Sequence, residues 1–121
     1  MLEFANSEKI QTLLGADKVV IIETGAFMDC KELKEIELPA LMFWDGFAFK
    51  GCKKLEKFSA KTLTNNYDEM EYIPFRLFGN GFEFEGCSSL TDVELPSLQR
   101  GSEGMFRGCS SLTNIELPLL E

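Results

Sequence analysis

The chain has 121 residues, 45% of them hydrophobic, which fits one ordinary domain with a sizeable core. Twenty acidic against 12 basic residues give a net charge of -8, which disfavours binding to a phosphate backbone, so we expect no nucleic-acid partner. Histidine, the commonest general base and metal ligand, is absent, and no apolar run approaches the ~20 residues that cross a membrane. We therefore expect a soluble protein with no cofactor and no membrane insertion. No signal peptide is recognisable, and the composition leaves the compartment open.

Residues 1–24 are expected to form an N-terminal cap and a lead-in strand. The apolar run at 19–22 predicts a short strand. Gly15 matches the end of a short helix. Four apolar residues before that strand are compatible with one face of this helix: Phe4, Ile10, Leu13 and Leu14.

A repeated pattern fills residues 25–121. Its four copies are marked by cysteines 22, 35 and 22 residues apart. Each cysteine has a phenylalanine three residues before it, a leucine three residues after it, and apolar residues six and eight residues after it. The segments 84–99 and 106–121 are identical at 11 of 16 positions. Internal repeats of this length predict a solenoid, with the cysteines at Cys30, Cys52, Cys87 and Cys109.

Each copy contains one alternating apolar segment that predicts a short strand, near 34–38, 56–60, 91–95 and 113–117. Stacked copies would place equivalent residues side by side in a parallel sheet and merge their apolar positions into one core. The return segment that carries Phe-x-x-Cys is too short for a full helix. We expect extended or single-turn 3₁₀ structure there.

The copy that begins Gly25-Ala26-Phe27 and the two later Phe-x-Gly-Cys-Ser-Ser-Leu copies resemble the BspA-type leucine-rich repeat of bacterial surface proteins. The resemblance implies a right-handed solenoid with one short strand per 22-residue repeat. It also implies a module, often part of an adhesin at the cell surface or secreted, that binds proteins or surfaces and carries no catalytic residues. The family usually places alanine before the phenylalanine, whereas two copies here carry Glu83 and Met105.

The four cysteines allow three interpretations. Their spacing and the absence of histidine disfavour a metal site. Equivalent residues on adjacent coils could approach within disulfide range, but stacked side chains that point the same way suit the bond poorly. We favour a ladder of small buried thiols beside a ladder of phenylalanines, with all four thiols unreactive until the chain unfolds.

The outward positions of the strands form the first candidate binding surface. They are acidic, with Lys57 as the lone base, and parallel stacking sets Glu94 against Glu116. This repulsion indicates a basic partner or a cation, and the alternative is a solvated face that keeps the protein soluble. The candidate ligand-binding residues on this face are Glu35, Glu37, Lys57, Asp92, Glu94 and Glu116.

An insertion of 13 residues within about 64–81 explains the spacing of 35 and is the second candidate. It contains both tyrosines, Tyr67 and Tyr72, which are candidate ligand-binding residues because insertions in repeat proteins often map to the binding face. The alternative is a degenerate coil whose aromatic side chains pack inward.

The sequence therefore favours a non-catalytic module that binds a protein or surface ligand. The alternative is a structural spacer or assembly element. In that case the last strand, near 113–117, would offer an uncapped edge for self-association with neighbouring chains.

Overall fold

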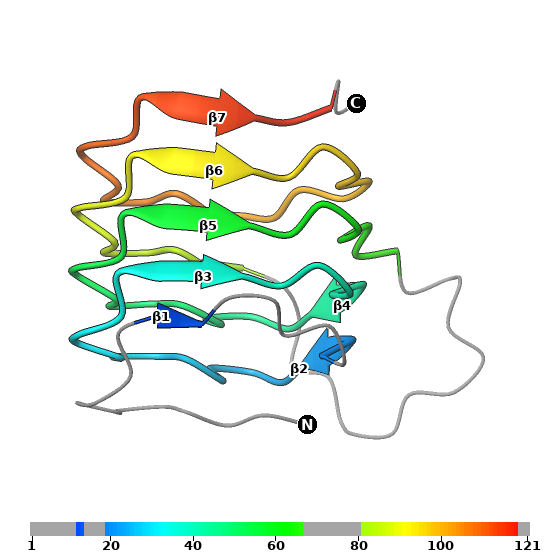
Figure 1. The fold of residues 1–121 in the computed structure, drawn as a ribbon, viewed down its shortest axis with the longest axis horizontal. Coiled ribbons are helices and arrows are strands. Elements are labelled where there is room, and N and C mark those ends of the chain that lie inside the picture. The colour runs from blue at the N-terminus through cyan, green and yellow to red at the C-terminus, as the bar shows by residue number, and fades with distance from the viewer. Residues whose placement is uncertain (1–11, 14–18, 67–80, 119–121) are drawn as a thin grey trace.

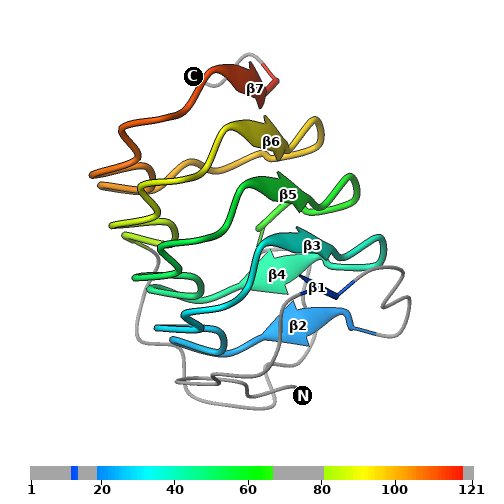
Figure 2. The same cartoon turned by 60° about the vertical axis from the view of Figure 1, so that its left-hand side comes forward.

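A computed structural model describes residues 12–13, 19–66 and 81–118 as a stack of coils (Figures 1 and 2). Each coil contributes a short strand to one main sheet and returns through tight turns on the opposite side. All strand pairs are parallel, in the order β1-β3-β5-β6-β7. These strands are β1 (Thr12–Leu13), β3 (Glu35–Glu37), β5 (Lys57–Ser59), β6 (Asp92–Glu94) and β7 (Asn114–Glu116).

The register of the main sheet confirms the repeat frame. Ile36 pairs with Phe58, Phe58 with Val93, and Val93 with Ile115, which are the residues six after each cysteine. Strands β5 and β6 pair directly although 35 residues separate equivalent positions, so the extra residues between them do not interrupt the stack. The hand of the superhelix stays a prediction.

The N-terminal region differs from the expectation. Leu13, one of the residues assigned to a short helix, lies in β1 and pairs with Ile36 of β3. No helix occurs among the described residues, and the rest of the expected helical segment lies outside them. Parallel pairing satisfies backbone groups along the edge of β3. The sequence signal was present, because Phe4, Ser7 and Ile10 precede Leu13 at the spacing of the Phe, Cys and Leu positions in the later copies.

A second sheet of two strands lies at the other corner of the coils. It pairs β2 (Ile21–Ile22), which confirms the predicted lead-in strand, with β4 (Phe43–Trp44), which was not predicted. Both residues of β4 are buried, so the segment reads as apolar without alternation. A strand of two residues is too short to show a period of two in the sequence.

The return segments are successive turns closed by hydrogen bonds between residues three apart, which agrees with the expected single-turn 3₁₀ structure. In the first coil Cys30 N donates to Phe27 O at 3.2 Å and Leu33 N donates to Cys30 O at 3.3 Å. The residue before each cysteine has a left-handed backbone, with φ of +78° at Gly51, and such residues prevent the turns from merging into a helix. Residues with side chains rarely adopt the φ of Gly51, which favours glycine in the Gly-Cys pair of this copy.

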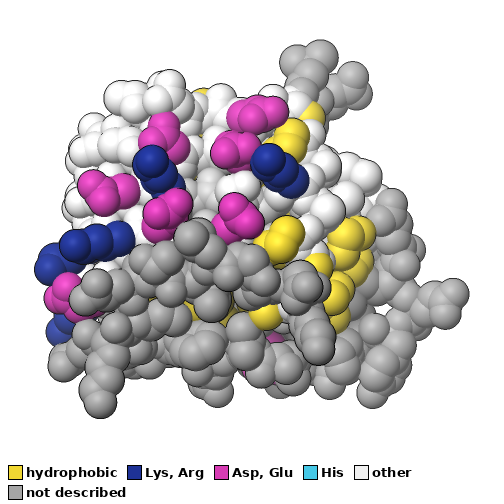
Figure 3. Space-filling view, in the orientation of Figure 1, with side chains coloured by type: hydrophobic (Ala, Val, Ile, Leu, Met, Phe, Trp, Pro, Cys, Tyr) yellow, Lys and Arg dark blue, Asp and Glu magenta, His cyan; other side chains and the backbone are white. Residues whose placement is uncertain are grey.

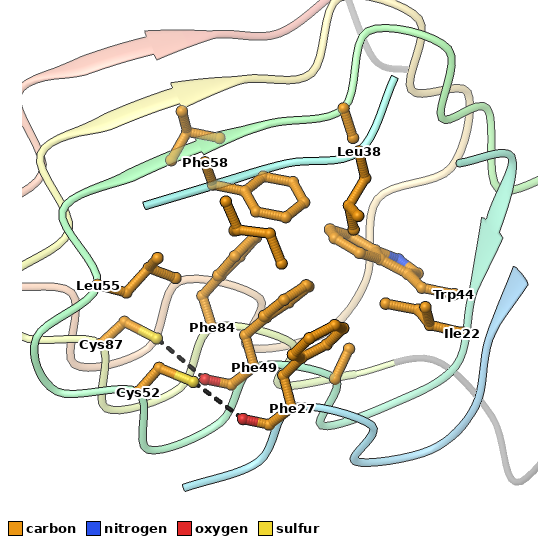
Figure 4. Packing of buried hydrophobic residues seen from close by; sticks show 14 of the residues in the cluster. Ile22, Phe27, Leu38, Trp44, Phe49, Cys52, Leu55, Phe58, Phe84 and Cys87 are labelled. Carbon is orange, nitrogen blue, oxygen red and sulfur yellow. Dashed lines mark hydrogen bonds between the residues drawn. The ribbon is translucent and has the colours of Figure 1, made fainter. Parts of the chain in front are cut away.

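The core is one continuous cluster that runs through the stack (Figure 4). The phenylalanines that precede the cysteines stack on one another, with ring centroids 5.1, 5.4 and 5.6 Å apart from the first pair to the last. Trp44 closes the core from β4 and meets Phe49 and Phe84 edge-on. This arrangement confirms the predicted ladder Phe27, Phe49, Phe84 and Phe106.

The cysteines are free thiols beside this ladder, as predicted. Three of them donate a hydrogen bond to a carbonyl of the preceding coil, at 3.0 to 3.2 Å. A hydrogen bond with the Cys30 thiol, followed by burial, raises the pKa of Cys52. Burial raises the pKa of Cys87 to about 12 and that of Cys109 to about 11. The thiol-to-carbonyl pairs are Cys52 to Phe27, Cys87 to Phe49 and Cys109 to Phe84.

Candidate ligand-binding face

The outward side chains of β3, β5, β6 and β7 surround a groove of about 590 Å³ on the main sheet. Acidic and basic side chains are interspersed over this face (Figure 3). All six candidates predicted on the strands line the groove: Glu35, Glu37, Lys57, Asp92, Glu94 and Glu116. The two tyrosine candidates, Tyr67 and Tyr72, lie outside the described residues.

One row of side chains across this face, here called the mixed row, comprises Glu35, Lys57, Asp92 and Asn114. The register places Lys57 between Glu35 and Asp92, each on a neighbouring strand. Asn114 Nδ2 donates a hydrogen bond to Asp92 Oδ1 at 2.7 Å. The carboxylates of this row therefore have a cation or a hydrogen-bond donor within the row.

The second row, here called the acidic row, comprises Glu37, Ser59, Glu94 and Glu116. Glu94 and Glu116 are directly paired, which confirms the predicted like-charge contact. Lys61, beyond the end of β5, approaches Glu94 Oε2 at 3.9 Å, but both side chains are largely exposed, so this ion pair stabilises little. The acidic row therefore carries negative charge that the sheet does not neutralise.

The floor of the groove is rigid because its inner side belongs to the core. Ile36, Phe58 and Val93 line the groove with their strands, while their side chains are at most 2% exposed. Backbone bonds between neighbouring strands hold the two rows at a fixed separation. Side chains on such a scaffold keep the spacing that a ligand would recognise.

A different kind of surface lies at the last coil. Ile115 and Leu117 are 44% and 37% exposed, whereas their counterparts in the coil before, Val93 and Leu95, are almost fully buried. Within the part of the chain that the structure describes, β7 pairs only with β6. Apolar side chains and unpaired strand groups thus meet at this end of the stack.

Among the residues that the structure describes, three buried polar residues were not predicted to be buried: Asp45, Asn65 and Glu83. Only Glu83 had a signal, because it replaces the alanine that usually precedes the phenylalanine. In the described ranges, no group of three or more acidic or cysteine side chains is placed to hold a metal ion. A helix of the length and apolarity needed to cross a membrane is likewise not found there.

Comparison with protein families identifies the family of the repeat. Residues 2–118 match the family model of the BspA type leucine rich repeat region in six copies, whereas the cysteine spacing predicts four. The match begins within the expected cap, and the division into a cap at 1–24 and repeats at 25–121 stays a prediction. No curated protein matches the chain, and no solved structure matches it.

Proposed function

Because the chain belongs to the BspA-type leucine-rich repeat family, we propose that it is a non-catalytic module that binds a protein or surface ligand rich in basic groups. The observation that carries this proposal is the acidic row beside the groove on the main sheet. A place in a bacterial surface adhesin is part of the same proposal.

The spacing of the acidic row suits an extended basic segment. Adjacent strands lie about 4.8 Å apart, so the carboxylates of Glu94 and Glu116 can both contact one guanidinium or ammonium group. Glu37 lies two strands further along the row and can receive a second basic side chain. Lys57 in the mixed row would repel a ligand whose charges are out of register.

Binding would relieve a cost that the free protein carries. Two carboxylates directly opposite each other on neighbouring strands destabilise the sheet. A cation between Glu94 and Glu116 turns this repulsion into two attractions. Because the face is exposed, this contribution must weaken as salt increases.

Charge reversal tests the proposal. The variant Glu94→Lys/Glu116→Lys is compared with Glu32→Lys/Glu103→Lys, which changes the net charge equally away from the groove. The probe is an oligolysine peptide, with oligoglutamate as the negative control, and binding is measured by fluorescence anisotropy. We expect the first variant to lose about tenfold in affinity at low salt, equivalent to ~1.4 kcal/mol.

The control variant should lose far less affinity for oligolysine than the sheet-face variant. Equal losses in the two variants would show that net charge, and not the acidic row, attracts the probe. Tyr67→Ala and Tyr72→Ala extend the test to the insertion. A specific loss of binding would place these tyrosines in the site, and a loss of stability alone would support inward packing.

The exposed end of the stack favours a second candidate function, assembly. Ile115 and Leu117 would be covered if another chain added a coil against β7. Light scattering over a range of concentrations tests this. A mass that increases with concentration in the native protein but not in Ile115→Lys supports assembly, and a constant monomer mass contradicts it.

A further inference from the structure

Glu83 is a buried acid in a position that the other coils fill with small or apolar residues. It stands four residues before Cys87, where the other copies have Ala26, Ala48 and Met105. Its exposed fraction is 0%, like that of Ala48. The binding face does not use this carboxyl group, which is absent from the lining of the groove.

The Glu83 carboxyl group joins two segments that are far apart in the chain. Gly81 N donates to Oε2 at 2.6 Å, and Ser102 Oγ donates to Oε1 in a short contact. Beside them, Phe82 N donates to Glu103 O at 2.9 Å. Glu83 therefore connects the segment that begins at Gly81 to the segment that opens the last coil.

A second buried carboxyl group, that of Asp45, lies on the same side of the stack. It accepts hydrogen bonds from Thr24 Oγ1 at 2.6 Å and from Gly46 N at 2.9 Å. Each of the two acids accepts a hydrogen bond from a hydroxyl group and another from a backbone amide, so this flank supplies similar donors to both carboxyl groups.

The surroundings of Glu83 favour its neutral form. Burial raises the pKa of Glu83, and the charge of Asp45 raises it further, while the hydrogen bonds from Ser102 and Gly81 lower it in part. Among the described residues, Asp45 is the charged group whose field raises the pKa of Glu83. The groups that donate hydrogen bonds to Glu83, the Ser102 hydroxyl and the Gly81 amide, are neutral. A serine hydroxyl can accept as well as donate, so the contact with Ser102 can persist when Glu83 carries a proton.

We propose that Glu83 is a proton-operated latch, which holds the 81–86 segment against the last coil when it is neutral and loosens that contact when it ionises. Ionisation would place a second negative charge in the core near Asp45, and an uncompensated buried charge is costly. Opening the segment to water removes that cost, so ionisation and local opening are coupled.

The sign of the effect follows from linkage. The pKa of Glu83 in the folded state lies above its ordinary value of 4.5, so the native protein binds more protons than the unfolded chain in that interval. The contribution is fully present below about pH 4.5 and is lost as the pH rises through the folded pKa. The latch closes in acid and loosens toward neutral pH.

The test compares the native protein with Glu83→Gln, which keeps the shape but cannot ionise, and with Glu85→Gln, a partly exposed glutamate that pairs with Lys50. Thermal midpoints are measured from about pH 4.5 to about pH 8. We expect the midpoint of the native protein to fall relative to Glu83→Gln by about 4 °C or more. Glu85→Gln should follow the native profile.

Two further measurements keep the proposal falsifiable if Glu83→Gln folds poorly. Glu83→Ala restores the residue of the first two copies and should also remove the pH dependence. In the native protein, the ¹³C shift of the Glu83 carboxyl group should titrate above pH 4.5, together with faster hydrogen exchange at the Gly81 and Phe82 amides. The latch would be overturned if the thermal midpoints of the native protein and of Glu83→Gln changed in parallel with pH. It would also be overturned if the Glu83 carboxyl group titrated at or below its ordinary pKa. Both outcomes are independent of whether the protein binds a basic ligand.

Discussion

Two flanks of the same coils follow different rules. The side of the stack that carries Cys52, Cys87 and Cys109 is here called the thiol flank. It repeats one arrangement, in which a phenylalanine stacks on its counterpart and a cysteine donates a hydrogen bond to a carbonyl of the previous coil. The polar flank changes from coil to coil. Its hydrogen bonds involve different residues in each coil, although the buried Asn65 Nδ2 has no hydrogen-bond partner among the described residues. The residues of this flank are Thr24, Asp45, Asn65, Glu83 and Ser102. Repetition on one side sets the spacing of the stack, while variation on the other makes each coil distinct.

The physical reason lies in the two kinds of contact. Apolar stacking is non-directional and roughly additive, so the same residues serve in every coil. A buried polar group must be satisfied individually, and leaving it without a partner costs about 1–3 kcal/mol. The polar flank therefore holds groups that a neighbouring coil of different sequence would leave unsatisfied, which disfavours stacking in the wrong register.

The largest effect should come from breaking the thiol flank in the middle of the stack. Phe49 is fully buried and stacks on both Phe27 and Phe84, so Phe49→Ala should cost about 3–5 kcal/mol. Phe106 is half-buried and stacks on one ring only, so Phe106→Ala should cost clearly less. Urea unfolding measures both, and equal costs would contradict a core that runs along the stack.

Alkaline pH should weaken the thiol flank next. The pKa values of Cys52 and Cys87 lie above the ordinary 9.0, so the folded state binds more protons and stability falls as pH rises above about 9. At about pH 10 each thiol should contribute a loss of ~1.4 kcal/mol, about 3 kcal/mol for the two. Cys87→Ser should remove about 1.4 kcal/mol of the difference between pH 7 and 10 in urea unfolding. An unchanged difference would show that other groups cause the alkaline loss.

A smaller effect is expected on the polar flank. Thr24→Val removes the hydroxyl that donates to Asp45 Oδ2 at 2.6 Å and leaves a buried carboxylate oxygen with one donor fewer. We expect a loss of about 1–3 kcal/mol in urea unfolding, with Thr62→Val as a control for an exposed hydroxyl. If both variants lose the same stability, the buried hydrogen bond to Asp45 stabilises the protein no more than an exposed one does.

The smallest effect concerns reactivity and leaves stability unchanged. Cys30, Cys52 and Cys87 are buried, whereas Cys109 in the last coil is half-buried. We expect all four thiols to resist a maleimide reagent near neutral pH, with Cys109 the first to react as pH rises toward about 11. Rapid labelling of an inner thiol in the native protein would contradict the buried ladder.

Most of the main sheet could be predicted from the repeat frame. Four strands lie within the predicted ranges, and the outward rows with their Glu94–Glu116 pair follow from alternation and a constant offset between copies. These features were predictable because a solenoid converts sequence spacing directly into spatial neighbourhood. The thiol ladder followed for the same reason, since each cysteine has a counterpart in every coil.

Features that depend on a particular pair of coils are visible in the folded structure and not in the repeat frame. The strand at Leu13, the second sheet through Trp44 and the left-handed turn residues have signals too short or too degenerate to read in one copy. Asp45 looks like a surface acid in the sequence, and the repeat frame marks Glu83 as unusual without identifying its partners. Neither spacing nor composition reveals the hydroxyl donors that other segments supply to these two acids. Regular contacts repeat in the sequence and can be predicted, whereas a buried polar contact occurs once and is defined by the residues that fold around it.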